Sequence, residues 1–296
     1  MRIVTQQLAR TLTLVLVSIL ASACLVRYAP GALVDERELN QRASEGTLAD
    51  LREQKAQQRD VGVNFVRYLQ GLAHGDLGFS ESNHSPVSAL LADRAPRTLL
   101  DLGFGLALAW LVGLGCALVV VRFPFIWSLD VAMLALATLI LSLPVALIAY
   151  FCLLAEQASR LVLAIVLAPK IFQYSRGVLT SVYAASHVEM ARARGVSEST
   201  IVRTHVLPAA ASQLIALAAA SISLAIGAAI PIEAICDVPG LGRLAWQAAT
   251  ARDLPLLINV TMLVTLATTT AMAVSEIFHS QILHAKPGEF DLGGGV

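Results

Sequence analysis

Long runs of apolar residues, separated by short charged segments, constrain this sequence more than any other feature. A bilayer core is crossed by a helix of about 20 mainly apolar residues. The chain has 296 residues, of which 56% are hydrophobic and 14% charged, and this is not the composition of a soluble globular domain. We therefore expect an all-α polytopic membrane protein with six transmembrane helices, at residues 9–28, 99–121, 131–154, 161–174, 209–230 and 256–278.

Composition and motifs exclude several classes of function. The formal net charge is zero and no basic face is evident, which argues against nucleic-acid binding. The four cysteines lie in or beside apolar runs and are read as small core residues. No G-x-x-x-x-G-K-[ST] phosphate loop occurs, so no ATP site of that kind is expected. His74, Asp76 and His84 match no metal-site spacing, and we predict neither a metal nor a cofactor.

Hydropathy divides the chain into four parts. Residues 1–28 are an N-terminus and first span, 29–96 a hydrophilic segment between spans one and two, and 97–286 a core of five spans. Residues 287–296 are a Gly-rich tail that we expect to be flexible. The first span has a rival reading as a signal peptide, because residues 21–23 read Ala-Ser-Ala, like a cleavage site. If the span is retained, Arg2 and Arg10 place the N-terminus in the cytoplasm and residues 29–96 outside.

Prolines predict irregularities in the core. An amphipathic helix is expected over 86–95, leading to Arg97 and Asp101 and the second span. Pro144 predicts a kink in the third span, and Pro169 with Lys170 interrupts the fourth. Lys170 itself has two readings. It is either a functional charge inside the membrane or a lysine that snorkels to the cytoplasmic surface.

The polar stretch 183–208, between the fourth and fifth spans, has a specific internal layout. Ser186 is a candidate N-cap for a short helix that ends at Gly195, a residue suited to the left-handed conformation. Ser197 is a candidate N-cap for a second short helix over 200–205. Such a pair of helices forms a compact knob; the plainer alternative is a loop whose arginines fix the topology.

This knob resembles the EAA loop of ABC-importer permeases. Glu189, Ala191, Gly195 and Leu207-Pro208 carry the resemblance, and Met190 departs from it. The variant A-R-A-R-G-V-S, followed by His205, is similar to the dipeptide/oligopeptide/nickel permease branch. In that family the loop is the coupling helix, which sits in a cleft of the cytoplasmic ATPase. The resemblance assigns ATPase coupling to Glu189, Ala191, Arg192, Arg194, Gly195, His205 and Pro208.

A second resemblance lies at residues 233–244, after the fifth span. The sequence P-G-L-G-R there is similar to a partly re-entrant element near the outer mouth of the pathway in the same permeases. Its proline and glycines permit a tight reversal, although a capped turn outside the membrane is an alternative. The G-D-L-G-x-S turn at 75–80 and the A-R-D-L-P motif at 251–255 also match the family. The outer-mouth residues assigned in this way are Glu233, Pro239, Gly240, Gly242 and Arg243.

These resemblances imply the ABC type I importer permease fold and a transport function without an ATPase site of its own. The expected partners are a second permease subunit, two ATPase subunits and an external solute-binding protein, in a bacterial inner membrane. Glu189 is expected to pair with a basic residue of the ATPase, and Arg192 or Arg194 with acidic ones. The cargo is expected to be di- or oligopeptides, with nickel or another small solute as the alternative.

Two other classes of membrane protein fit the sequence less well. An ion-driven secondary transporter requires paired carboxylates near the bilayer midplane, whereas Asp130, Glu233 and Glu276 lie near the ends of spans. An intramembrane protease requires a motif such as G-x-S-x-G or H-E-x-x-H, and neither occurs.

Overall fold

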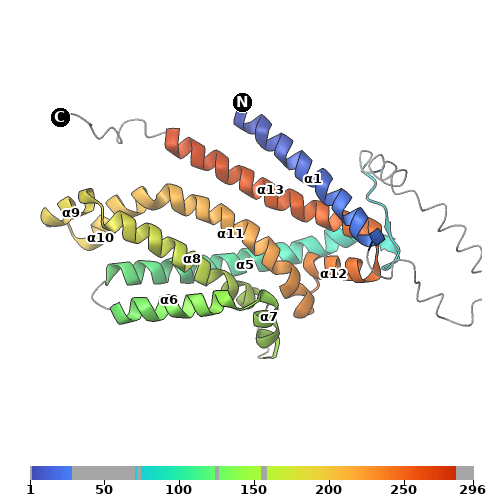
Figure 1. Ribbon diagram of the computed structural model, residues 1–296, viewed down its shortest axis with the longest axis horizontal. Helices are drawn as coiled ribbons and strands as arrows, with labels where there is room; N and C mark the ends of the chain where they lie inside the picture. The colour runs from blue at the N-terminus through green and yellow to red at the C-terminus, as the bar shows by residue number, and fades with distance from the viewer. Residues whose placement is uncertain (1, 29–70, 72–74, 124–126, 155–158, 285–296) are drawn as a thin grey trace, which may run out of the picture.

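Long helices lie side by side along the molecule's longest axis in the computed structural model (Figure 1). The structure describes residues 2–28, 71, 75–123, 127–154 and 159–284. Most of the predicted hydrophilic segment 29–96 and the predicted tail 287–296 lie outside these ranges. The helices α9 and α10 form one end of the bundle, and α12 lies at the other (Figure 1). The two sites expected from the sequence therefore occupy opposite ends.

The first and last helices pack against each other. Helix α1 (Arg2–Tyr28) lies along α13 (Leu254–His284). Ile19 and Ile258 are both buried in this contact. The Ser22 and Thr261 hydroxyls are 2.8 Å apart, and Arg10 forms an ion pair with Glu276 at 3.2 Å. The start of α1 is thereby fixed beside the later part of α13.

Helices α5 (Val87–Arg122) and α8 (Ser159–Tyr183) form the closest pair in the bundle. A Cβ added to Gly113 of α5 would lie 2.8 Å from the Ala168 carbonyl oxygen of α8, so the two backbones approach closely there. Both helices run through an internal proline. The helix expected over 86–95 forms the first part of α5. The predicted interruption at Pro169 and Lys170 is wrong, because α8 continues through both residues. A proline removes one helical hydrogen bond, and the packing on either side keeps each helix continuous.

The third predicted span is broken rather than kinked. Helices α6 (Trp127–Ser142) and α7 (Val145–Leu154) meet at an angle of 98°. Leu143 N–H donates to Ile140 O at 3.2 Å, and Pro144 O accepts from Leu147 N–H at 2.9 Å. Proline has no N–H with which to continue the α6 ladder, so one helix ends and a new one begins. The prediction of a single kinked span over 131–154 needs this correction.

The knob and the fifth span are continuous with each other. Helix α9 (Ser186–Ala193) is followed by α10 (Glu198–Ile201), a π-helical turn η1 (Val202–Val206) and α11 (Leu207–Ile235). The last three form one helical segment of 38 residues. The second short helix expected in the knob is therefore the beginning of the fifth span. Helix α12 (Leu241–Ala251) follows α11 after a short turn.

A small hairpin precedes α5. Strand β1 (Phe79–Ser80) pairs antiparallel with β2 (Ser85–Pro86), with Phe79 opposite Pro86. Gly75 and Gly78 have φ values of +79° and +78°, which residues with a Cβ resist. The turn expected from G-D-L-G-x-S is confirmed.

Four helical segments are long and apolar enough to cross a membrane, or five if α6 and α7 count as one broken span. The apolar part of α1, Ala9–Ser22, is shorter. These counts refer to the described ranges only. The all-α membrane architecture is confirmed, whereas the six-span count stays a prediction.

Candidate functional site

The turn that ends α9 has the geometry of a Schellman motif. Gly195 has a φ of +77°. Its N–H donates to Arg192 O at 3.0 Å, and the Val196 N–H reaches back to Ala191 O at 3.2 Å. These bonds satisfy carbonyl groups that the end of a helix leaves unpaired. The predicted role of Gly195 in ending the helix is confirmed.

The start of α9 differs from the prediction. Ala185, with extended backbone, is the N-cap, and Ser186 is the first helical residue. The Ala185 carbonyl oxygen accepts from the Val188 and Glu189 N–H groups at 3.0 and 3.3 Å. Helix α8 continues to Tyr183, so the chain turns one residue earlier than a capping box at Ser186 requires. The other expected cap, Ser197, does occupy the N-cap position of α10.

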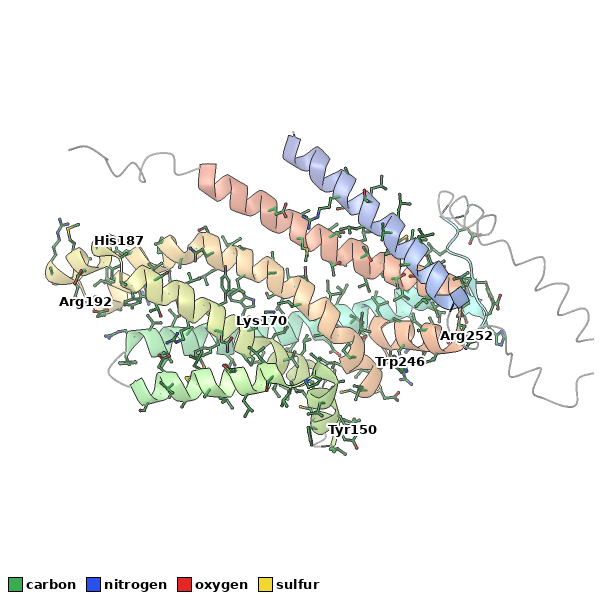
Figure 2. All side chains as sticks on the ribbon, in the orientation of Figure 1. Tyr150, Lys170, His187, Arg192, Trp246 and Arg252 are labelled. Atoms are coloured by element: carbon green, nitrogen blue, oxygen red, sulfur yellow. The ribbon has the colours of Figure 1, made fainter. Side chains whose placement is uncertain are left out.

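Helix α9 has a buried face and an exposed face. Val188 and Ala191 are buried in an apolar cluster that includes Leu179 of α8 and Ile201 of α10. Glu189, Arg192 and Arg194 are exposed, and Met190 is 58% exposed. The exposed face projects from the end of the bundle (Figure 2). The knob is therefore packed on one side and presents charged side chains on the other.

Arg192 has a partner within the chain. Its Nε donates to Glu198 Oε1 at 2.8 Å, which links α9 to the start of α10. This ion pair spans the Gly195 turn and helps to fix the angle between the two helices. The sequence predicted that Arg192 or Arg194 pairs with acidic residues of the ATPase, and it did not indicate this internal pair.

The base of the knob is a widened helical turn before a proline. In η1, the Leu207 N–H bonds to Val202 O, five residues back. Directly after it, Pro208 lacks an N–H, and its ring would clash with the Thr204 carbonyl group in a regular α-helix. His205 lies in this turn, and its ring centroid is 6.4 Å from that of His187 in α9. The structure thus brings the predicted residues His205 and Pro208 to the junction of the knob and α11.

The opposite end of the bundle is organised around Glu233. This residue is 2% exposed, and its Oε2 accepts a hydrogen bond of 2.6 Å from the Gly242 N–H. Gly242 lies in the first turn of α12, where unpaired N–H groups favour a carboxylate. A Cβ on Gly240 would lie 2.3 Å from Glu233 Oε2, and one on Gly242 would lie 2.5 Å from the Ile230 Cα. The glycines therefore allow α12 to approach Glu233 and α11.

The reversal between α11 and α12 is held by further contacts. Asp237 has a φ of +54°, and the Arg243 guanidinium bonds to its carboxylate at 2.7 Å. The Leu241 N–H donates to Thr98 Oγ1 of α5 at 2.8 Å. Pro239 precedes Gly240 in this turn. The structure thus gathers all five predicted outer-mouth residues: Glu233, Pro239, Gly240, Gly242 and Arg243.

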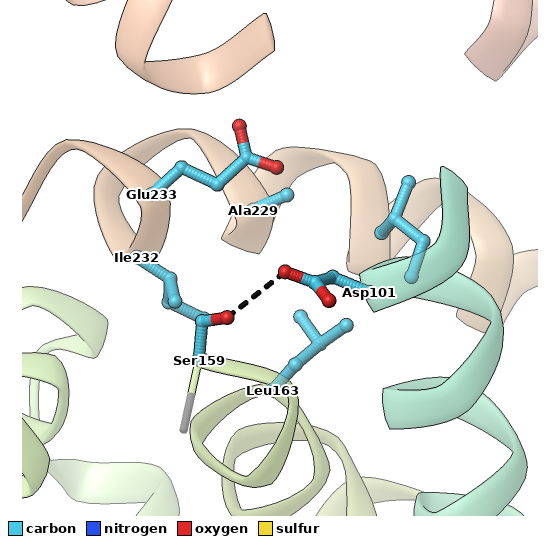
Figure 3. Close-up of a pocket in the computed structure, with 7 residues that line it drawn as sticks. Asp101, Ser159, Leu163, Ala229, Ile232 and Glu233 are labelled. Carbon is cyan, nitrogen blue, oxygen red and sulfur yellow. Dashed lines mark hydrogen bonds between the residues drawn. The ribbon is translucent and has the colours of Figure 1, made fainter. Parts of the chain in front are cut away.

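A small pocket beside Glu233 contains a residue that sequence reasoning did not select. Asp101 of α5 is 6% exposed, and its Oδ2 accepts from Ser159 Oγ at 2.9 Å (Figure 3). Arg97 and Arg160 lie 3.6 and 3.5 Å from its carboxylate oxygens. In the sequence, Asp101 could have been recognised as a single acidic residue at the start of a long apolar run.

Two distant sequence motifs meet at this same end of the molecule. Asp253, from A-R-D-L-P, is 3% exposed, and its Oδ2 accepts from the Ser80 and Ser82 hydroxyls at 2.6 and 2.7 Å. Burial acts to raise the pKa of Asp253, but these hydrogen bonds and the Ser82 N–H outweigh it, so the pKa lies below its usual value. The Asn259 amide adds a bond of 2.7 Å to Leu77 O. The hairpin before α5 is therefore fastened to the start of α13.

Comparison with known proteins identifies the family to which this chain belongs. The family model described as "Binding-protein-dependent transport system inner membrane component" matches residues 105–284, which include the knob, α11 and α12. The chain belongs to this family. It is a permease subunit of an ABC importer and a multi-pass protein of a bacterial inner membrane, and its family works with ATPase partners. The resemblance drawn from the EAA-like loop is confirmed.

Individual relatives agree with the family. The permease is 29% identical over 272 residues to a candidate peptide permease protein of Brucella suis, covering 81% of this chain and 84% of that protein. It is 24% identical over 227 residues to the glutathione transport system permease protein GsiC of Salmonella paratyphi A, covering 71% and 74%. A chain of the inward-facing MetNI methionine ABC transporter has the same fold, with a TM-score of 0.58 and 16% identity, over 65% of this chain and 96% of that one.

Proposed function

We propose that this permease imports short peptides and forms one half of a pathway completed by a second, related permease chain. One ATPase subunit would dock on the knob of this chain and a second on the other permease chain. A solute-binding protein would deliver peptide at the Glu233 end. ATP would be hydrolysed by the ATPase subunits and not by this chain. The relatives named as peptide and glutathione permeases support this cargo. Nickel or another small solute is the second candidate.

The observation that carries the coupling role is the two-sided construction of α9. Its buried residues Val188 and Ala191 are packed against Ile201, at the beginning of the segment that continues into the fifth span. Its exposed residues Glu189 and Arg194 remain free to meet another protein. A displacement of α9 by the ATPase would therefore move α11 as a connected body. Rigid-body motion of this kind is a common mode of coupling.

The proposed orientation of the chain in the membrane follows from the packing of its helices. The Arg10–Glu276 pair fixes α1 beside the later part of α13, which runs from the α12 end toward the α9 end of the bundle (Figure 1). If the knob is cytoplasmic, the N-terminus is cytoplasmic too. Residues 29–96 and the β1–β2 hairpin then belong to the outer side. This placement agrees with Arg122 at the inner end of α5.

A reconstituted importer tests the coupling role of Glu189. Permease, second permease, ATPase and binding protein are co-purified into proteoliposomes, and ATP-dependent uptake of a labelled dipeptide is measured. We expect Glu189→Arg to reduce both ATPase retention during purification and uptake. Ser128→Ala, an exposed change at the start of α6 and outside the knob, is the control and should leave both unchanged. Normal ATPase retention and uptake in Glu189→Arg would contradict the assignment.

A further inference from the structure

Lys170 is an unusual residue for its place in the fold. It lies in the middle of α8, half-way along the molecule (Figure 2), and it is exposed. Within the described ranges it has neither an ion-pair nor a hydrogen-bond partner. An ionised side chain inside a membrane span is costly and generally faces a bundle interior or a water-filled cavity. The question is what this ammonium group faces in the assembled importer.

The packing of α8 against α5 gives the depth of Lys170. Gly113 of α5 sits against Ala168 and Ile171, so Lys170 lies at the level of Gly113. In α5 no charged residue occurs between Asp101 and Arg122. At 1.5 Å per residue, Gly113 is about 18 Å from Asp101 and about 14 Å from Arg122. On α8 itself the flanking charges are Arg160, about 15 Å away, and Arg176, about 9 Å away and paired with Asp130 of α6. Lys170 therefore lies inside the apolar layer, nearer to the Arg176 side.

Snorkelling does not bring the ammonium group to either charged level of α8. A lysine carries this group on a four-carbon stem, and helical side chains lean toward the helix N-terminus, which here is away from Arg176. The same face of α8 is also unlike a lipid-facing surface. Gln173, Tyr174 and Gly177 follow at three, four and seven positions, which places them on one side of the helix with Lys170. Gln173 donates to Thr138 of α6 at 3.1 Å, Tyr174 is 48% exposed, and a Cβ on Gly177 would meet open space.

We propose that this face of α8 lines the translocation pathway and that Lys170 pairs with the carboxylate of the passing peptide. The proposal rests on the proposed peptide import. A carboxylate leaves water at high cost unless a partner charge replaces its hydration, and a cation inside the apolar layer supplies that partner. The face is exposed in this chain because the opposite wall of the pathway belongs to the second permease. Gln173 and the Tyr174 hydroxyl add polar groups along the same line.

The test compares two substrates in the complete reconstituted importer. Uptake of a dipeptide with a free C-terminus is measured against uptake of its C-terminal amide, for wild type, Lys170→Met and Lys170→Arg. Each variant's ratio of the two rates is divided by the wild-type ratio, which removes any preference of the binding protein. We expect Lys170→Met to lower this ratio by about tenfold, because it removes a charge-pair partner. Lys170→Arg should keep the ratio near the wild-type value.

Other outcomes overturn the proposal. An equal loss of uptake of both substrates in Lys170→Met would indicate that Lys170 forms a structural ion pair, for example with a carboxylate of the second permease. Unchanged uptake of both would show that the charge does not meet substrate. Ile165→Met, an exposed change on another side of α8, controls for perturbation of the helix. If the wild-type importer transported nickel and no peptide, the proposed cargo would be contradicted. The wild-type measurement alone distinguishes this result from a failure of the Lys170 proposal.

Accessibility gives a second measurement that does not depend on the amide. Lys170→Cys is treated with a charged, membrane-impermeant thiol reagent, with and without peptide and ATP, and modification is read by mass spectrometry. We expect the introduced thiol to react and to be protected during peptide transport. Absence of reaction in every state would place the position against lipid and overturn the proposal.

Discussion

The buried carboxylate of Asp253, at the start of α13, accepts hydrogen bonds from the side chains of Ser80 and Ser82, more than 170 positions earlier in the chain. This contact joins the hairpin before the second span to the beginning of the last one. It closes the α12 end of the bundle across the α5–α13 boundary. The charged acceptor makes these bonds stronger than bonds between neutral groups.

Loss of this contact should destabilise the permease. Asp253→Ala leaves the fully buried Ser80 hydroxyl without its acceptor, and an unpaired buried polar group costs about 1–3 kcal/mol. The measurement is thermal unfolding of the purified subunit in detergent. Ser85→Ala is the control, since the Ser85 hydroxyl bonds only to the exposed Asn83 carbonyl among the described contacts. An unfolding midpoint equal to that of wild type would contradict the prediction.

The same contact should make stability depend on pH. The pKa of Asp253 is lower in the folded protein than in the unfolded chain, so its contribution is complete above the unfolded value of about 3.9. The contribution is lost as the pH falls through the folded value. We expect the difference in unfolding midpoint between wild type and Asp253→Asn to shrink below about pH 4. A difference that stays constant down to the lowest measurable pH would contradict this.

Gly242→Ala should destabilise the contact between α12 and α11. The added Cβ would lie 2.5 Å from the Ile230 Cα and 3.0 Å from Glu233 Oε2. Because the first of these is a backbone atom, relief requires α12 to move, at a cost of about 1–3 kcal/mol. Thermal unfolding in detergent measures this loss. Gly227→Ala, where a Cβ meets nothing within 4 Å, should change the midpoint far less.

Gly195→Ala should strain the knob without a steric clash. A Cβ at this position meets no atom within 4 Å, but the φ of +77° is disfavoured for L-residues by about 1–2 kcal/mol. We expect weaker ATPase retention and lower uptake in the reconstituted importer. Gly195→Asn should perform better than Gly195→Ala, because asparagine tolerates the left-handed conformation. Equal performance of the two variants would show that this conformation is not what the knob requires.

Local chemistry made much of this architecture predictable from the sequence. Apolar runs indicated the helices, and Gly195 indicated the end of α9 because only its missing Cβ makes the left-handed turn easy. The outer-mouth residues were found through the P-G-L-G-R pattern. The physical reason for glycine in this pattern, the close approach of α12 to Glu233, is visible only in the structure.

The missed features depend on contacts between distant parts of the chain. Asp101 and Ser159 are 58 positions apart and meet only because α5 and α8 pack together. The continuity of α8 through Pro169 was not predicted, because it also depends on packing contacts with other helices. These contacts offset the one backbone hydrogen bond that the proline removes. The 98° break at Pro144 exceeds a proline kink because the new helix takes its first acceptor from Pro144 itself.

The widened turn at 202–206 contains one residue more than a regular α-helix needs. Each helical residue rotates the chain by about 100°. Deleting one residue there would therefore allow an ordinary helix but would swing α9 by roughly that angle about the α11 axis. Glu189 would then point toward a different side of the membrane protein. Under the proposed coupling role, the direction from which the ATPase approaches is thus set by one additional residue at the start of the fifth span.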